Sequence, residues 1–296
     1  MAGFTLQWTV CSEDAGRDVK TFLKEQNVSK TALTDIKFKG GKISVNQQEV
    51  TVRYLLQHND VLTVIFPVEQ PSVGLNPENI PLDIRYEDDY LLVVNKPSEM
   101  NTIPSREHPT GSLANGLIHY FNRLGLQATA HIVTRLDRNT SGLVLVAKHR
   151  HIHHLLSEQQ KNGGIERTYE AFVEGQLKQK SGRIEAPIGR KEDSIIEREV
   201  RDDGQYALTH FQVLQQLPSF TWIQLRLETG RTHQIRVHLS HIGHPLVGDD
   251  LYGGKLDLMD RQALHCKRLQ FRHPLLEKTL VLTGELPEDL KRLTLN

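Results

Sequence analysis

The chain has 296 residues, of which 38% are hydrophobic and 24% charged, a composition typical of soluble globular proteins rather than disordered or membrane proteins. Its 36 basic and 36 acidic side chains give a formal net charge of zero, which excludes a uniformly cationic nucleic-acid binder. No apolar run is long enough to span a bilayer, the two cysteines cannot form a disulfide framework, and the first residues do not resemble a secretion signal. We therefore expect a cytoplasmic protein that does not associate with membranes.

A proline-rich stretch is expected to divide the chain. Four of the twelve prolines lie between Pro67 and Pro81, and prolines at this density disfavour both helix and central strand. The length also exceeds that of one typical domain. We predict a small domain over residues 1–68, a linker over 69–81 and a large domain over 82–296.

The small domain is predicted to be mixed and locally basic. The hydrophobic pattern predicts helices over 16–26 and 29–39, then strands over 42–45, 50–52 and 61–66. Ser29 is the expected N-cap of the second helix. The segment from Arg17 to Arg53 holds eight basic and four acidic residues, so positive charge is concentrated there. Such charge more often marks a solvated helix face than a phosphate-binding surface.

The same segment resembles the RNA-binding module named after ribosomal protein S four. The resemblance rests on the helix pair, on the G-x-I-x-V-N pattern from Gly41 to Asn46, and on the strand that follows Asp60. It implies that this domain binds RNA, with Lys30 and Lys37 among the contacts.

The large domain is predicted to alternate strands and helices without an internal repeat. Strands are expected over 91–95, 143–147, 171–174, 220–227 and 279–282, and helices over 112–124 and 232–242. This mixture predicts an α+β domain whose long polar loops are available to form a binding cleft.

The most informative segment runs from Thr134 to Leu143, where Asp137 stands between Arg135 and Arg138. Flanking guanidinium groups favour the ionised carboxylate, which suits a nucleophile or base rather than an acid. The two arginines can also bind phosphate through paired hydrogen bonds. From these residues alone, a structural ion pair at a turn remains the commoner alternative.

The segment resembles the H-R-L-D-x-x-T-S-G-L signature of the RluA-type pseudouridine synthases of large-subunit ribosomal RNA and tRNA, with Thr134 in place of the usual histidine. Three further segments resemble the family in the same order, namely Tyr86–Met100, Glu166–Gly175 and Leu227–Gly254. The resemblance implies a mainly antiparallel mixed sheet flanked by helices and loops. It also implies site-specific isomerisation of uridine to pseudouridine in structured RNA, without a cofactor.

The resemblance further implies roles for individual residues. Asp137 would be the essential carboxylate, acting at the ribose by attack or by deprotonation. Tyr169 would stack on the uracil, and Arg231 would pair with Asp137. Ile235 would pack on the other face of the base, and Arg135 would enter the RNA where the uridine leaves.

Two other functions remain open. A non-catalytic RNA-binding or ribosome-assembly protein derived from this family would keep the fold and lose the reaction. A metal-dependent hydrolase is suggested by histidines clustered at His149–His154 and His233–His244, but no H-E-x-x-H or comparable spacing is present, so we predict no metal. We expect RNA as the partner, ribosomal RNA rather than tRNA, and a monomer, since no heptad pattern occurs.

Overall fold

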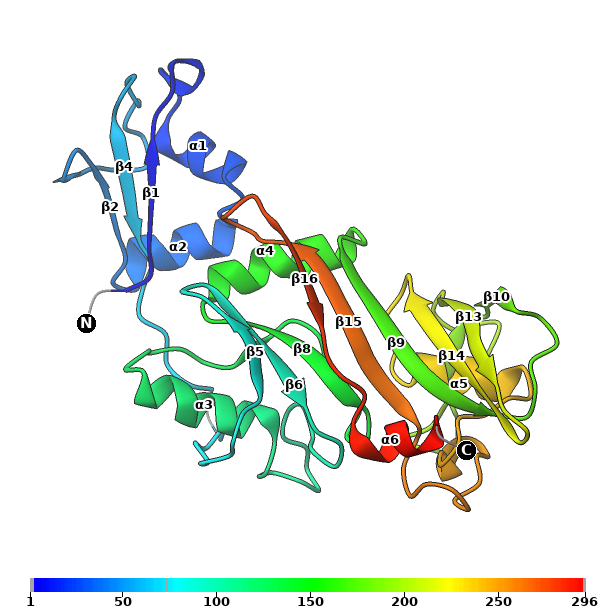
Figure 1. Ribbon diagram of the computed structural model, residues 1–296. Helices are drawn as coiled ribbons and strands as arrows, with labels where there is room; N and C mark the ends of the chain where they lie inside the picture. Colours follow the sequence, from blue (N-terminus) through cyan, green and yellow to red (C-terminus); the bar gives the residue numbers. More distant parts are fainter. Residues whose placement is uncertain (1–2, 73, 295–296) are drawn as a thin grey trace.

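The computed structural model describes residues 3–72 and 74–294, which form two units of unequal size, each with its own sheet and hydrophobic core (Figure 1). Between Ile65 and Ile84 the described residues form neither helix nor strand, in keeping with the proline content of that stretch. No helix in the described part of the chain is both long and apolar enough to cross a membrane.

The N-terminal unit is an antiparallel sheet with two helices packed on it. Its elements are β1 (Thr5–Thr9), α1 (Val19–Glu25), α2 (Lys30–Phe38), β2 (Lys42–Val45), β3 (Gln48–Glu49) and β4 (Val61–Ile65), with strand order β1-β4-β2-β3. Ser29 caps α2 as predicted, since its Oγ accepts a hydrogen bond from the Ala32 N–H. The strand predicted over 50–52 is wrong. Asn46 and Gln47 both have positive φ and form a tight turn, so pairing starts at once with Gln48.

The large unit is built on a sheet of ten strands. They are β5 (Ile84–Glu87), β6 (Leu91–Lys96), β7 (His131–Ile132), β8 (Ser141–Ala147), β9 (Ile165–Glu174), β10 (Ser181–Glu185), β13 (Leu208–Gln216), β14 (Phe220–Leu227), β15 (Leu264–Arg272) and β16 (Thr279–Thr283). Eight follow the order β10-β13-β14-β9-β15-β8-β6-β5, with β16 on β15 and β7 on β8. Among the described strands only β15 and β8 pair in parallel, so the predicted α+β fold with a mainly antiparallel mixed sheet is confirmed.

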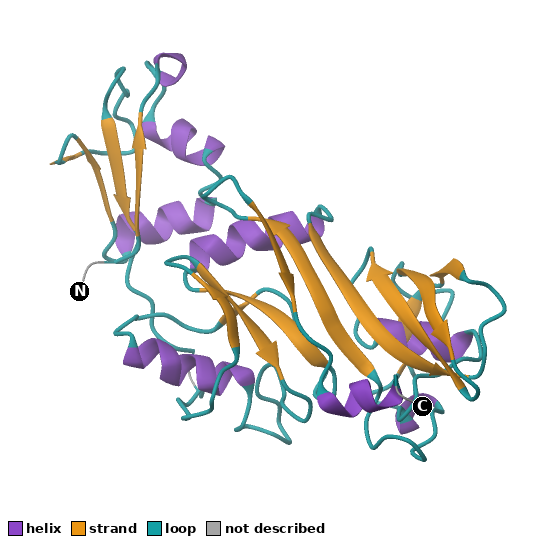
Figure 2. Cartoon of the chain, in the orientation of Figure 1, coloured by secondary structure: helices purple, strands orange, loops and turns teal. Residues whose placement is uncertain are grey.

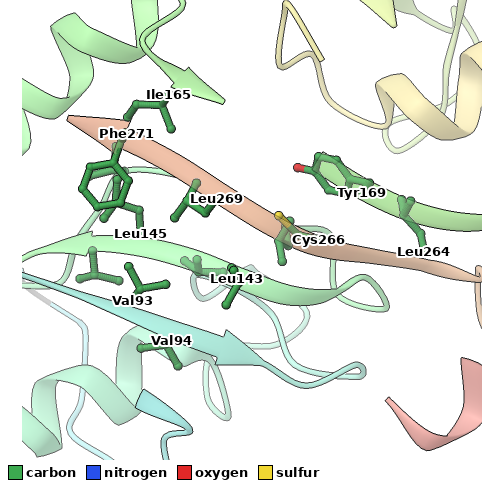
Figure 3. Packing of buried hydrophobic residues seen from close by; sticks show 14 of the residues in the cluster. Val93, Val94, Leu143, Leu145, Ile165, Tyr169, Leu264, Cys266, Leu269 and Phe271 are labelled. Carbon is green, nitrogen blue, oxygen red and sulfur yellow. The ribbon is translucent and has the colours of Figure 1, made fainter. Parts of the chain in front are cut away.

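Helices and a separate hairpin surround this sheet (Figure 2). They are α3 (Leu113–Arg123), α4 (Arg150–Lys161), α5 (Gln234–His241), α6 (Glu288–Leu293) and the hairpin of β11 (Ile188–Arg190) with β12 (Arg198–Val200). Helix α4 packs on β8 and β9, while α5 packs on β12 and β13. Every residue of β8 is buried, and the core extends from β6 through β8 and β15 to Tyr169 on β9 (Figure 3). The site below is therefore attached to the most buried strands of the fold.

The histidines of α4 and its N-cap lie where the two units meet. His149 stacks on Phe4 with ring centroids 4.1 Å apart, and His151 stacks on Phe66 at 5.1 Å. Burial lowers the pKa of His151 to about 4, so it packs as a neutral ring. The Arg150 guanidinium adds an ion pair to Asp35 of α2 at 3.0 Å. These contacts give the first histidine cluster a packing role between the units.

A substitution at Gly142 tests how tightly β8 and β15 approach each other. Gly142 has φ +119°, and a Cβ there would lie 2.4 Å from the Cys266 carbonyl oxygen. We expect Gly142→Ala to lower the free energy of unfolding by more than about 3 kcal/mol. Gly163→Ala is the matched control, because Gly163 also has positive φ but open space around it, and should cost about 1–2 kcal/mol. Equal losses in urea titrations of the two variants would contradict this packing.

Candidate active site

A small pocket lies where the loop before β8 meets β9 and the start of α5. It brings together segments far apart in the sequence, and its lining includes Arg135, Asp137, Thr140, Arg167, Tyr169, Arg231, His233, Ile235 and Arg236. Of the predicted site residues, the pocket thus contains Asp137, Tyr169, Arg231, Ile235 and Arg135. Three others are not in its lining, namely Arg138, Lys30 and Lys37, and the two lysines are exposed on α2 of the N-terminal unit.

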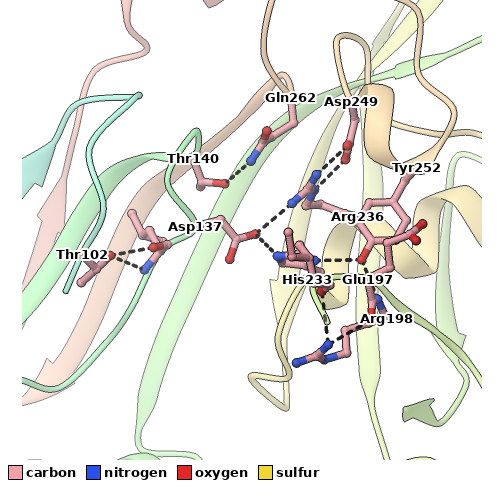
Figure 4. A network of polar contacts seen from close by, with 12 residues as sticks. Thr102, Asp137, Thr140, Glu197, Arg198, His233, Arg236, Asp249, Tyr252 and Gln262 are labelled. Atoms are coloured by element: carbon pink, nitrogen blue, oxygen red, sulfur yellow. Dashed lines mark hydrogen bonds and ion pairs between the residues drawn. The ribbon is translucent and has the colours of Figure 1, made fainter. Parts of the chain in front are cut away.

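Buried hydroxyl groups fix the backbone that leads to Asp137. The Thr102 Oγ1 donates to the Leu136 carbonyl oxygen at 2.6 Å (Figure 4). Thr134, which replaces the usual histidine of the signature, is buried and its Oγ1 accepts a hydrogen bond from the Leu145 N–H at 2.9 Å. The residue at that position therefore joins the loop to β8 and does not line the pocket.

Lys96 at the end of β6 holds the other side of the loop. Its fully buried Nζ donates to the carbonyl oxygens of Pro97, Met100 and Arg138 at 2.7–3.1 Å. Burial lowers the pKa of this ammonium to about 7, and the nearby Asp137 charge opposes that shift. Three acceptors and a neighbouring carboxylate thus compensate this buried ammonium.

Asp137 is paired with α5, but not through the arginine predicted from the sequence. Its Oδ2 lies 3.7 Å from Arg236 Nη1 and 3.9 Å from His233 Nε2 (Figure 4). Arg231 instead donates through Nε to the Tyr206 carbonyl oxygen at 2.9 Å. The predicted pairing of Arg231 with Asp137 is therefore wrong. Arg231 lies two residues before His233, the N-cap of α5, whereas Arg236 lies in the first turn of that helix.

A second carboxylate fixes Arg236. Its Nε and Nη2 donate to the two carboxylate oxygens of Asp249, each at 2.7 Å, and Asp249 is 1% exposed. The ring of Tyr252 lies 4.8 Å from the guanidinium carbon. Although burial opposes the charge, the hydrogen bonds with Asp249 raise the pKa of Arg236 above its ordinary value. Arg236 is therefore a permanent cation beside Asp137.

Tyr169 and Ile235 form apolar walls of the pocket. Both are 4% exposed, Tyr169 on β9 and Ile235 on α5. Burial raises the pKa of the Tyr169 phenol well above its usual range, and the nearby Cys266 and Asp137 add to the shift. Tyr169 is thus an uncharged aromatic ring at neutral pH, suited to stacking.

Positive charge converges on this pocket. Of the described residues that line it, one is a carboxylate and four are arginines, namely Arg135, Arg167, Arg231 and Arg236. Two other cations near the signature have partners elsewhere, since Lys148 pairs with Glu87 at 2.7 Å and Arg150 pairs with Asp35. The neutral net charge therefore conceals a local site suited to a polyanion.

Sequence reasoning missed three of the residues that organise the pocket. His233 belongs to the second histidine cluster weighed above as a metal site, and the sequence motifs assign no role to Asp249 or Tyr252. Within the described residues, no group of three or more His, Cys, Asp or Glu side chains is arranged to hold a metal ion. In the helix predicted over 232–242, the three-residue spacing of His233 and Arg236 is the available signal for the pair that faces Asp137.

Comparison with known proteins identifies the family. A profile described as RNA pseudouridylate synthase matches residues 90–241. The chain is 53% identical to the uncharacterised RNA pseudouridine synthase YjbO of Bacillus subtilis, over 93% of this chain and 97% of that protein. It is 36% identical to the ribosomal large subunit pseudouridine synthase D of Xylella fastidiosa, over 99% and 92% of the two chains.

A solved structure gives the same result. The human RNA pseudouridylate synthase domain containing 1 superposes with a TM-score of 0.58 at 25% identity, covering 74% of this chain and 86% of that one. The family predicted from the four sequence segments is therefore confirmed, and the chain belongs to the RNA pseudouridylate synthases.

Proposed function

We propose that this enzyme converts uridine to pseudouridine at specific positions of structured RNA, and that its substrate is ribosomal RNA of the large subunit. The observation that carries the proposal is the single pocket that holds Asp137, Tyr169 and Arg236. The similarity to a ribosomal large subunit pseudouridine synthase along nearly the whole chain supports the choice of RNA. We expect the enzyme to act as a monomer in the cytoplasm.

Entry of the target base into the pocket requires that it leave the RNA stack. Unstacking a base costs a few kcal/mol, roughly, in such enzymes. Arg135 at the pocket rim carries a planar guanidinium that can fill the vacated position and contact phosphate. The uracil would then lie between the Tyr169 ring and Ile235, two apolar surfaces of one pocket.

Isomerisation needs no redox or phosphoryl chemistry, and a carboxylate can act in it as nucleophile or base. Asp137 would act at the ribose, by attack on C1′ or by deprotonation, as the bond from C1′ to N1 breaks. The freed uracil turns within the pocket, and a bond forms from C1′ to C5 as the bond from Asp137 to C1′ breaks or, on the deprotonation route, as the proton is returned to the ribose. The proton on C5 is released and N1 takes up a proton in its place. Substrate and product are isomers, so this chain's residues suffice for the atom balance. Arg236 would stabilise the negative charge that returns to Asp137 when that carboxylate leaves C1′ or gives its proton back.

The N-terminal unit is proposed to bind the same class of RNA. Lys30 and Lys37 both project from the exposed face of α2, where phosphates can reach them. A purely RNA-binding function, the alternative considered above, would not require the buried pairing of Arg236 beside Asp137. The intact arrangement of these side chains therefore favours an enzyme.

Replacement of Asp137 tests the reaction itself. With RNA labelled with tritium at C5 of uridine, we expect Asp137→Asn to slow tritium release by about 10²–10⁴-fold, because the amide is neither nucleophile nor base. Asp202→Asn is the control, since Asp202 is exposed and outside the pocket. Release by Asp137→Asn at the wild-type rate would overturn the assignment.

Two matched arginine variants test which cation serves Asp137. Arg236→Lys keeps the charge but loses the paired hydrogen bonds with Asp249, so the single-turnover rate should fall about 100-fold. The single-turnover rate of Arg231→Lys should fall less than about tenfold, because the Arg231 side chain donates to a backbone carbonyl oxygen and not to Asp137. A larger loss of rate in Arg231→Lys than in Arg236→Lys would contradict this assignment and favour Arg231 as the partner of Asp137.

The salt dependence of RNA binding tests the N-terminal unit. Affinity for RNA falls as salt rises, and the double variant Lys30→Glu and Lys37→Glu should make this dependence shallower. The slope of log affinity against log salt should decrease in magnitude by about 1.5, as expected for two lost phosphate contacts. Its single-turnover rate at saturating enzyme should stay unchanged. The control pair Lys178→Glu and Lys180→Glu changes two exposed lysines of the large unit. An equal change of slope in both double variants would argue against a specific role for α2.

A further inference from the structure

Tyr252 contacts both groups that face Asp137, and the reaction described so far does not use it. It ends the short helix η2 (Asp250–Tyr252), and its hydroxyl oxygen accepts a hydrogen bond from the Arg198 N–H at 2.9 Å. The same oxygen lies 2.8 Å from His233 Nδ1, while the ring lies against Arg236 (Figure 4). One tyrosine thus links the imidazole and the guanidinium beside the candidate catalytic carboxylate.

The direction of these hydrogen bonds determines which nitrogen of His233 carries a proton. A phenol has one proton, and the Tyr252 oxygen already accepts from Arg198. Among the described residues, the acceptor within hydrogen-bond distance for that proton is His233 Nδ1. If Nδ1 accepts, the proton of a neutral imidazole resides on Nε2. Nε2 is the nitrogen that faces Asp137 Oδ2 at 3.9 Å.

The backbone of His233 is consistent with a side chain placed for this purpose. His233 is the N-cap residue of α5, yet its side chain makes no capping hydrogen bond. Its φ of 57° lies in the left-handed region, which is strained for a residue with a Cβ. The imidazole instead contacts Tyr252 and lies near Asp137. Strain retained at such a position indicates a functional constraint.

We propose that Tyr252 is a positioning residue that keeps His233 neutral with its Nε2–H directed at Asp137. The carboxylate then faces one fixed cation, Arg236, and one neutral donor. A distance of 3.9 Å exceeds that of a hydrogen bond, and catalytic hydrogen bonds commonly tighten when substrate binds. The catalytic consequence rests on the proposed function, whereas the proton position does not.

The electrostatic surroundings agree with a neutral imidazole. Five charged or titratable groups face His233, each from a different segment. They are Asp137 of the signature loop, Arg236 of α5, Arg198 of β12, Asp249 before η2 and Tyr252 of η2. Burial lowers the pKa of His233 the most, and the two arginines lower it further against the effect of the carboxylates. A protonated His233 would give Asp137 a second cation and weaken it as nucleophile or base.

Nitrogen-15 spectra of the full chain labelled at histidine test the proton position without RNA. The His233 signals are identified as those missing from His233→Gln. We expect a neutral ring protonated at Nε2 in the wild type at pH 7, and a larger cationic fraction in Tyr252→Phe at the same pH. A wild-type ring that is cationic or protonated at Nδ1, or a spectrum unchanged by Tyr252→Phe, would overturn the proposal.

The pH dependence of tritium release tests the catalytic consequence. Tyr252→Phe keeps the ring against Arg236 but removes the bond that favours neutral His233, so the pKa of His233 should rise. We expect a near wild-type single-turnover rate at pH 8.5 and a roughly tenfold deficit at pH 6. In the His233→Gln background, where an amide N–H replaces the titrating ring, Tyr252→Phe should produce no extra pH dependence.

The outcomes separate this proposal from the proposed function. A deficit of Tyr252→Phe that is equal at both pH values, or that keeps its pH dependence in the His233→Gln background, would contradict the role of Tyr252. If the wild type released no tritium from any RNA, the proposed function would fail, and the nitrogen-15 spectra would still decide the proton position.

Discussion

The paired hydrogen bonds between Arg236 and Asp249 are the interaction on which the candidate site depends. Both groups are buried, and removing one partner of such a pair costs about 3–5 kcal/mol, so the guanidinium has little freedom to move. Two of its nitrogens are occupied by Asp249, which leaves Nη1 directed at Asp137. A surface arginine would provide the same charge without a fixed direction, and preorganised charge is what stabilises a reacting carboxylate.

The sheet brings the remaining groups to this ion pair. β8 begins shortly after Asp137, and β15 lies between β8 and β9, so the loop that carries Asp137 lies near the strand that carries Tyr169. The close approach of β15 to Gly142 sets the spacing between them. Because these strands are buried on the core side, the pocket can be small and well defined, while Arg135 and Arg231 at its lining remain exposed.

Family resemblance in the sequence predicted part of this site, because Asp137, Tyr169 and Ile235 belong to contiguous motifs. The motif contains two arginines five residues apart, and the sequence does not show which of them faces Asp137. That distinction depends on where α5 begins, which places Arg236 inside the helix and Arg231 before it. The pairing of Arg236 with Asp249 depends on how the chain turns after that helix, which periodicity does not report. Helix α4 was missed because its buried apolar residues, chiefly Ile152 and Leu156, are few among histidines that pack against the N-terminal unit.

The most direct test of this account is a double-mutant cycle on the single-turnover rate of uridine isomerisation, with Asp249→Asn and Arg236→Lys made singly and together. If Asp249 acts by directing Arg236 at Asp137, each change should slow the reaction about 100-fold and the double variant should be no slower than either. Effects that multiply, to about 10⁴-fold in the double variant, would show that the two residues act independently and would contradict the account.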